Sequence, residues 1–439
     1  MGKKIVVAGA GHGGLVAGMK LAAAGYEVTV YERKIRADLG YDWEDAIDFR
    51  IFADCGLEPP EKEEIEFNGD MKFYNPNLKA PIVVPANGKG SAVFERSEIY
   101  DVLISAAEQN GVKIIYNTEI IAPVMNGLRV TGIRTSDGVV DADLVIDAAG
   151  INSPIRRNLP VCCNVDRDYG YGECFYAYRA YFDKVPGHDP DVPYEVFLMH
   201  QGEHGISWVI TKDSFVDVLI GRMAPMSDKK IADTLDEMRA FSPQIGTTLL
   251  RGGSQEQIPV RRPLSVMVCD GYAAVGDSAY MTMPMTGSGI CASMRAGLML
   301  ADTVLADKEE EYSRETLWEY NRKYILHFGQ NFAAIDILKN VMLCTEVEGV
   351  NFLFDKQIIT ESDMSFGSGR SDSGMGFTDV LSRGIRGIGN LPVLLRTAGA
   401  LTKGDNVKKV YQSMPETYDE AAVLKWKDDI LAATTLMKR

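Results

Sequence analysis

Residues 5–32 read IVVAGAGHGGLVAGMKLAAAGYEVTVYE, and this stretch decides the fold of the first part of the chain. An apolar strand is followed by a G-x-G-x-x-G turn, an Ala- and Leu-rich helix, and a second apolar strand that ends at Glu32. Gly9 permits a tight turn, Gly11 lets backbone approach a pyrophosphate, and Gly14 lets the helix pack closely on the strand. The order of these features predicts a dinucleotide-binding βαβ unit.

The same stretch indicates where an ADP group would bind. The free N–H groups and positive dipole at the helix N-terminus favour phosphate. Glu32 lies 18 positions after Gly14, where a carboxylate accepts hydrogen bonds from ribose hydroxyls. His12, Gly13 and Arg33 lie within or directly beside these features, and we include them as candidates. The alternative is a glycine turn in an ordinary βαβ unit.

The bulk properties exclude several classes of function. A chain of 439 residues is long enough for two or three domains. Its net charge of −15 argues against a nucleic-acid partner, which requires a basic surface, and against general attraction to anionic membranes. No uncharged apolar run is long enough to span a bilayer, and the first strand begins too early to leave room for a signal peptide. Seven cysteines without a C-x-x-C pattern suit a reduced, cytoplasmic protein.

Changes of texture along the chain predict its organisation. The βαβ unit and the strands and helix after it lead to a buried strand over 144–148. Alternating aromatic and apolar runs then indicate an antiparallel sheet, after which dinucleotide-type sequence returns. We therefore expect an α/β (overall α+β) protein with a Rossmann-type domain, an inserted antiparallel-sheet substrate domain and a helical C-terminal part. The predicted segments are 1–160 and 265–310 for the cofactor domain, 161–264 for the sheet domain, and 311–439 for the helical part.

Residues 271–305 indicate which dinucleotide is bound. A short strand over 272–275 is followed by Gly276-Asp277, Pro284, a Gly-rich turn and a helix that starts at Ile290. A simple NAD dehydrogenase does not need this late unit, whereas an extended FAD does. Asp277 can accept hydrogen bonds from ribitol hydroxyls, and the glycines of the turn let backbone lie against the flavin ring, with the helix N-terminus facing it. The alternative is a glycine-rich loop that caps a packing helix.

Here the chain resembles FAD proteins of the p-hydroxybenzoate hydroxylase superfamily, and within it most closely the geranylgeranyl reductase family. The resemblance covers roughly residues 1–330 and implies an FAD-binding fold. It rests on motifs that occur in the order Gly9–Gly14 with Glu32, Phe94-Glu95-Arg96-Ser97, Val145-Ile146-Asp147-Ala148-Ala149-Gly150, Gly205-Ile206-Ser207-Trp208, Ile258-Pro259 with Arg262-Pro263, Val275-Gly276-Asp277-Ser278-Ala279, Pro284-Met285-Thr286-Gly287-Ser288-Gly289-Ile290 and Met294-Arg295-Ala296-Gly297.

The resemblance also implies roles for single residues. Arg96 would reach the flavin pyrophosphate or ribitol, and Ile120 would give backbone contacts to adenine, although Arg96 at a helix start and Ile120 in a core are the plainer interpretations. The implied cofactor contacts further include Gly150, Gly276, Asp277, Pro284, Gly287, Ser288, Gly289 and Ile290. The chain departs from the family at Leu39–Asp45, where prenyl reductases have a Cys-Gly-Asp segment, and at Val209-Ile210-Thr211, where they usually have an aromatic residue and a proline. These departures bear on the substrate.

Flavin supplies the chemistry, and the surroundings of the flavin decide the reaction. A reductase of prenyl chains needs a long apolar tunnel, whereas a hydroxylase needs a small pocket with polar anchors. The candidate substrate residues are Tyr178, Phe197, Trp208 and Met283. No catalytic acid stands out. His200 and His204 are four positions apart, but Gly202 and the strand context argue against a helical face that could bind a metal, so we expect no metal.

The sequence therefore favours an FAD-dependent oxidoreductase that reduces C=C bonds of a small hydrophobic, prenyl or lipid-like substrate by hydride transfer from flavin N5. One alternative is an NAD(P)H-consuming monooxygenase of the aromatic hydroxylase type, and another is a non-catalytic flavoprotein or electron carrier. No second G-x-G-x-x-G is present, so NAD(P)H would bind transiently or a ferredoxin-type protein would donate electrons. A basic, amphipathic segment over 383–403 could rest peripherally on the inner face of the membrane, although docking on the protein itself is the plainer interpretation.

Overall fold

The computed structural model describes residues 3–62, 66–67, 69–86, 91–367 and 391–435. Its first layer is a six-stranded sheet with the order β18-β19-β12-β1-β2-β8, in which all neighbouring pairs are parallel except β18–β19. The central strand is buried over Ile5–Ala8, as expected for a parallel strand covered on both faces. The strands are β1 (Lys4–Ala8), β2 (Glu27–Tyr31), β8 (Lys113–Ile115), β12 (Leu144–Asp147), β18 (Val268–Cys269) and β19 (Tyr272–Ala274).

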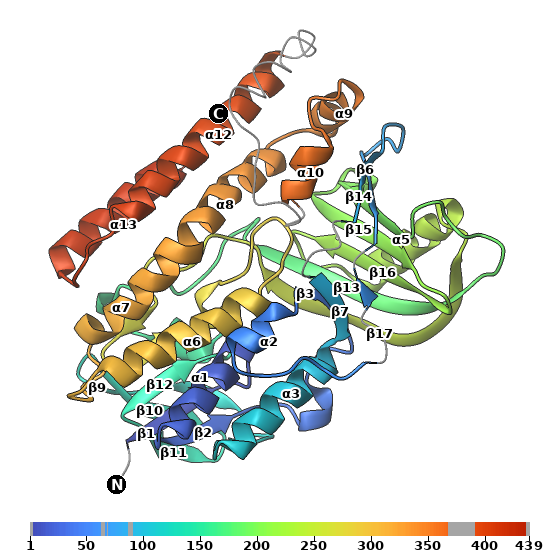
Figure 1. Ribbon diagram of the computed structural model, residues 1–439. Helices are drawn as coiled ribbons and strands as arrows, with labels where there is room; N and C mark the ends of the chain where they lie inside the picture. Colours follow the sequence, from blue (N-terminus) through green and yellow to red (C-terminus); the bar gives the residue numbers. More distant parts are fainter. Residues whose placement is uncertain (1–2, 63–65, 68, 87–90, 368–390, 436–439) are drawn as a thin grey trace.

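Helix α1 packs against both α3 and α6 (Figure 1). These helices are α1 (His12–Ala23), α3 (Arg96–Gln109) and α6 (Ile290–Ala306). Helix α3 begins with a capping box, in which Glu95 and Glu98 satisfy each other's backbone N–H groups. A three-stranded antiparallel sheet, β11-β10-β9, contacts β12 through β10. Its strands are β9 (Ile120–Asn126), β10 (Arg129–Thr135) and β11 (Gly138–Asp141).

The second layer is a seven-stranded sheet with the order β17-β13-β16-β15-β14-β5-β6. It includes β5 and β6, which precede the rest of its strands in the sequence by about a hundred residues, and β5 pairs in parallel with β14. One face is covered by α5 (Asp228–Phe241), whose apolar side packs on the sheet. The strands are β5 (Met71–Tyr74), β6 (Ile82–Val84), β13 (Cys174–Lys184), β14 (Tyr194–Leu198), β15 (Gly205–Thr211), β16 (Phe215–Arg222) and β17 (Ile245–Pro259).

A small antiparallel sheet, β3-β7-β4, leads into α3 and lies next to the larger sheet (Figure 1). Its strands are β3 (Glu44–Asp48), β4 (Glu66–Phe67) and β7 (Ser91–Glu95). Two short helices, α2 (Arg50–Asp54) and α4 (Pro154–Asn158), complete this part.

The described C-terminal residues are mainly helical, and α12 packs along α8 in Figure 1. The helices are α7 (Arg314–Tyr324), α8 (Gln330–Leu343), α9 (Val347–Asp355), α10 (Glu361–Gly367), α12 (Leu391–Gln412) and α13 (Glu420–Thr434). Of the basic segment discussed above, residues 383–390 lie outside the described residues. The helix α12 starts at Leu391 and continues past Pro392 and Gly399.

The contact between α1 and α6 joins the two cofactor-type segments. The Gly13 amide donates a hydrogen bond to Ser293 Oγ at 3.1 Å. A Cβ on Gly297 would lie 2.3 Å from the Gly13 carbonyl oxygen, and a Cβ on Gly13 would lie 2.4 Å from the Ser293 carbonyl oxygen. Glycine on both helices is therefore a condition of this approach.

We expect Gly297→Val to destabilise the protein by about 3 kcal/mol, because the added side chain must push α6 away from α1. Chemical unfolding of the FAD-free protein measures the effect. Gly399→Ala is the matched control, since a Cβ there meets nothing within 4 Å and Ala is the better helix former by about 0.5–1 kcal/mol. Equal stability of Gly297→Val and the unmodified protein would contradict the assigned packing.

Candidate FAD site

The G-x-G-x-x-G turn connects β1 to α1 and lies against the end of β12. Gly9 has φ +89°, and a Cβ on it would lie 2.6 Å from the Ala148 carbonyl oxygen. The corresponding distance for Gly11 is 2.9 Å, and a Cβ on Gly14 would lie 2.6 Å from the Ala148 Cβ. Only glycine fits these positions, and the backbone of the turn is left without side chains above it.

Glu32 is buried directly after β2, and its carboxylate is held beside the turn. It accepts hydrogen bonds from the backbone amides of Ala10 and Lys34, both at 2.8 Å. These hydrogen bonds fix the orientation of the carboxylate, whose remaining lone pairs can accept hydrogen bonds from ribose hydroxyls. Arg33 is exposed beside it. The Gly13 amide already donates to Ser293, so it joins the two segments and is not directed to a phosphate.

Arg96, the first residue of α3, is held by a carboxylate that the sequence interpretation did not single out. Asp45 accepts from Arg96 Nε at 2.5 Å and from Nη2 at 2.7 Å. Burial acts to raise the pKa of Asp45, but the Arg96 guanidinium outweighs it and holds that pKa below the ordinary range. Within the described residues, nothing accepts a hydrogen bond from Arg96 Nη1. One edge of the guanidinium is thus oriented by Asp45, and the other can serve a cofactor.

His12 lies in the glycine turn next to this ion pair. Its ring centroid lies 4.5 Å from that of Tyr100, with the two rings tilted by 35°, and its buried Nε2 finds no partner among the described residues. Burial, together with the Arg96 charge, lowers the pKa of His12 to about 4. His12 is therefore a neutral imidazole near pH 7, with an unsatisfied buried nitrogen at the turn.

The second cofactor segment carries Asp277, directly after Gly276. The Thr282 hydroxyl donates to Asp277 Oδ1 at 3.0 Å. Burial raises the pKa of Asp277, and the Thr282 hydrogen bond and the charges of Arg96 and Arg156 oppose this rise. The Arg96 charge thus acts on the pKa of Asp277, although the two residues are 181 positions apart in the sequence.

The Gly-rich turn before α6 completes this side. Gly287 has φ +72°, and a Cβ on it would lie 3.4 Å from Ile258 Cγ2 of β17, so the turn reaches the seven-stranded sheet. Gly289 caps α6 directly before Ile290. Pro284 is buried, Met283 is half-buried, and Ser288 is exposed with its carbonyl accepting from the Met283 amide at 3.0 Å.

Two further predicted cofactor residues, Ile120 and Gly150, lie at the start of β9 and just after β12. Ile120 is buried in the main core at the first residue of β9. Gly150, with φ +87°, donates its amide to Ser278 Oγ at 2.9 Å. Ser278 in turn donates to Asp147 Oδ1 at 2.9 Å, and this buried carboxylate also accepts from Tyr272 and Ser153. Sequence reasoning treated Asp147 only as part of a motif, whereas it ties the end of β12 to the second segment.

The residues fit an extended FAD. Gly9, Gly11 and Gly14 let the turn lie directly against Ala148 at the end of β12, and His12 offers an orphaned buried nitrogen. Arg96 has an unused edge for a pyrophosphate, Glu32 suits a ribose, and Asp277 suits the ribitol. The two segments thus supply groups for both ends of one cofactor.

The apolar face of the seven-stranded sheet lies next to the Gly287 turn. Trp43, directly before β3, packs there with a set of side chains that we call the apolar wall. Trp208 belongs to this wall, whereas Tyr178 and Phe197 lie on the opposite face and pack with α5. The sequence could not tell these faces apart. The wall consists of Trp43, Phe175, Ala177, Ile206, Trp208, Leu219 and Ile258.

One charged pair lies beside the apolar wall. Arg179 donates from Nε and Nη2 to Asp217 at 2.9 and 2.6 Å, and from Nη1 to the Glu44 carbonyl at 2.6 Å. The guanidinium lies 5.7 Å from the ring of Trp43 and 5.3 Å from that of Trp208. Since Asp217 is fully buried and neutralised, this pair leaves no free charge for a substrate anion.

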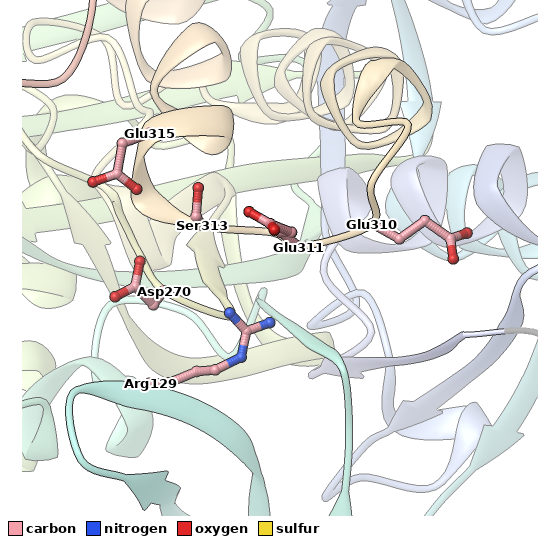
Figure 2. A pocket seen from close by; sticks show the side chains of 6 residues that line it. All are labelled: Arg129, Asp270, Glu310, Glu311, Ser313 and Glu315. Carbon is pink, nitrogen blue, oxygen red and sulfur yellow. The ribbon is translucent and has the colours of Figure 1, made fainter.

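Surface depressions occur elsewhere. Figure 2 shows a depression lined by four acidic residues, Arg129 and Ser313, between β10, β18 and the start of α7. Its volume is about 480 Å³. Its lining residues are Arg129, Asp270, Glu310, Glu311, Ser313 and Glu315. A second, of about 300 Å³, lies under α5 and includes Tyr178. Neither includes a residue of the glycine turns.

No group of three or more His, Cys, Asp or Glu side chains in the described ranges could hold a metal ion. None of the helices in the described part of the chain has the length and apolar character needed to cross a membrane.

Comparison with known proteins extends these observations. A family model described as "FAD binding domain" matches residues 3–330. The chain is 24% identical to a digeranylgeranylglycerophospholipid reductase of Sulfolobus acidocaldarius over 97% of this chain and 96% of that protein. It is 25% identical to a probable electron transfer flavoprotein-quinone oxidoreductase of Escherichia coli over 76% and 84% of the two chains.

Solved structures share the fold. A geranylgeranyl bacteriochlorophyll reductase-like protein from Thermoplasma acidophilum superposes with a TM-score of 0.72 at 18% identity, covering 91% of this chain and 99% of that chain. A myxobacterial chondrochloren halogenase, described as FAD-dependent, gives a TM-score of 0.60 at 18% identity, with 88% and 97% coverage.

We expect Asp277→Ala to weaken FAD binding roughly 10- to 100-fold, because a buried charged acceptor contributes about 1.5–3 kcal/mol. Titration of the FAD-free protein, followed by flavin fluorescence, gives the dissociation constant. Asp302→Ala on α6 is the control, since that carboxylate is exposed and pairs with Lys20. An unchanged constant for Asp277→Ala would contradict the assigned role.

Proposed function

The chain belongs to the FAD-binding domain family, and on that premise we propose that it reduces C=C bonds of a hydrophobic, prenyl or lipid-like substrate. It is an FAD-dependent oxidoreductase. The observation that carries the proposal is the apolar wall beside the Gly287 turn, where Ile258 lies 3.4 Å from a Cβ built on that glycine. The names of the reductase relatives support the same substrate class.

The residues have distinct tasks in this proposal. Glu32 and Arg96 hold the adenosine and pyrophosphate parts, Asp277 holds the ribitol, and the turn from Pro284 to Gly289 adjoins the ring. When bound, reduced FAD would supply a hydride from N5 to one alkene carbon, and a proton that reaches the other carbon from solvent would complete the reduction. The apolar wall binds and orients the alkene and excludes water from it, because removing the apolar surfaces of wall and substrate from water is favourable. Trp208 and Met283 remain the proposed substrate contacts.

The pairing of Arg179 with Asp217 beside the apolar wall favours a reductase over an aromatic hydroxylase. A phenolate needs a positive anchor, but Arg179 is neutralised by Asp217 and also bonded to the Glu44 carbonyl. We propose that electrons come from transiently bound NAD(P)H or a ferredoxin-type protein. We also propose that 1–160 and 265–310 form the FAD-binding unit and that 161–264, joined by β5 and β6, presents the substrate.

The reaction is tested by reducing the bound flavin without oxygen and adding a geranylgeranyl lipid. We expect the alkene to reoxidise the flavin, with one C=C bond reduced per flavin by mass spectrometry. The saturated phytanyl lipid is the control and should leave the flavin reduced. Two results count against the reductase: no reoxidation by any prenyl or unsaturated lipid, or reoxidation by oxygen that aromatic compounds accelerate, which would indicate a monooxygenase.

We expect Trp208→Ala to raise KM for the prenyl substrate about tenfold, since a large aromatic contact area is lost, while FAD affinity stays the same. Steady-state kinetics and FAD titration measure the two effects. Tyr178→Phe, on the α5 face of the sheet, serves as the control with unchanged KM. Equal KM values for Trp208→Ala and the unmodified protein would remove Trp208 from the substrate site.

A further inference from the structure

Residues 40–45 form a strained segment beside the FAD site, which we call the strap. Gly40, Tyr41 and Asp42 are consecutive left-handed residues, with φ +104°, +58° and +57°. This conformation is unfavourable for residues with a Cβ, so Tyr41 and Asp42 adopt it only where contacts hold them.

Arg251 of β17 holds the strap from the seven-stranded sheet. Its Nη1 donates to Asp42 at 2.9 Å and to Glu95 at 2.8 Å, and its Nη2 donates to Glu95 at 2.8 Å and Glu44 at 3.2 Å. The guanidinium also stacks 3.9 Å from the ring of Tyr181, whose hydroxyl accepts from the Glu44 amide at 2.9 Å. One arginine thus holds Asp42 and Glu44 of the strap together with Glu95, the residue before α3.

The opposite side of the strap holds Arg96. The Trp43 carbonyl accepts from the Arg96 amide at 2.8 Å, and the Trp43 ring lies 5.1 Å from the guanidinium. The Asp45 carboxylate accepts hydrogen bonds from Nε and Nη2 of the same guanidinium. A Cβ on Gly40 would lie 3.0 Å from the Ser97 amide nitrogen, so the strap also packs on the first turn of α3.

We propose that Arg251 is a positioning residue for FAD: it fixes the strap, and the strap aims Arg96 at the cofactor. Arg251 itself touches neither the glycine turns nor Asp277. The inference deepens the proposed function and rests on FAD binding at this site. It also makes the substrate sheet and the cofactor's arginine parts of one connected set of contacts, through β17, the strap and α3.

A double-mutant cycle on FAD affinity tests the proposal without any substrate. FAD dissociation constants are measured by flavin fluorescence for Arg251→Ala, Asp45→Asn and the double variant. Arg251→Ala and Asp45→Asn should each weaken FAD binding about tenfold. The double variant should bind FAD no more weakly than the weaker-binding of the two single variants, because both residues act through the orientation of Arg96. Arg251→Lys should restore only part of the affinity, since lysine keeps the charge but lacks the fork.

Arg239→Ala is the matched control. Arg239 is similarly half-buried in the same layer, pairs with Asp236 and lies 5.1 Å from the ring of Phe182, but it has no contact with the strap. Its removal should leave the FAD constant unchanged. If Arg251→Ala does not fold, the cycle is run with Arg251→Lys, which should show the same lack of additivity.

Two results overturn the proposal: unchanged FAD affinity in the Arg251 variant, or effects of Arg251 and Asp45 that multiply. Neither result touches the proposed reduction of alkenes, which the lipid experiment decides separately. A protein that binds no FAD at all would end both.

Discussion

The candidate site depends on the close approach of α1 to α6. Gly13 and Gly297 bring the two helix backbones together, and the Ser293 hydroxyl accepts the Gly13 amide at their crossing. A side chain larger than hydrogen at either glycine would separate the helices. Through this contact the turn that suits a pyrophosphate and the turn that suits a flavin ring become parts of one cradle, although they lie far apart in the sequence.

Around this cradle, buried and half-buried charges are paired across different parts of the chain. Asp45 faces Arg96, Asp217 faces Arg179, and Arg251 joins the strap to β17. Burying charges is costly, and breaking such a pair costs more than its presence contributes. These pairs therefore act mainly as geometric constraints, which fix where the sheet with the apolar wall lies relative to the cofactor's arginine.

Local pattern was enough to predict much of the fold. The βαβ unit, the helix that ends at Phe241 and the late strand-turn-helix unit are written in consecutive residues, because strand and helix periodicity and glycine turns act locally. Long-range partners were not predictable. Asp45 is one acid among many in its segment, and only the pairing of β3 with β7 brings it to Arg96. Likewise, alternation in β13 separates Tyr178 from Arg179, but the pairing of β13 with β16 and β17 in the seven-stranded sheet decides which face meets the apolar wall.

The central claim is that FAD is held by both segments at once, and hydrogen exchange with mass spectrometry tests it most directly. The account predicts that FAD slows exchange in peptides from 5–32 and 271–305 with the same dose dependence, whereas ADP alone slows exchange only in the first. Protection confined to one segment in the presence of FAD, or different dose dependences for the two, would contradict the account.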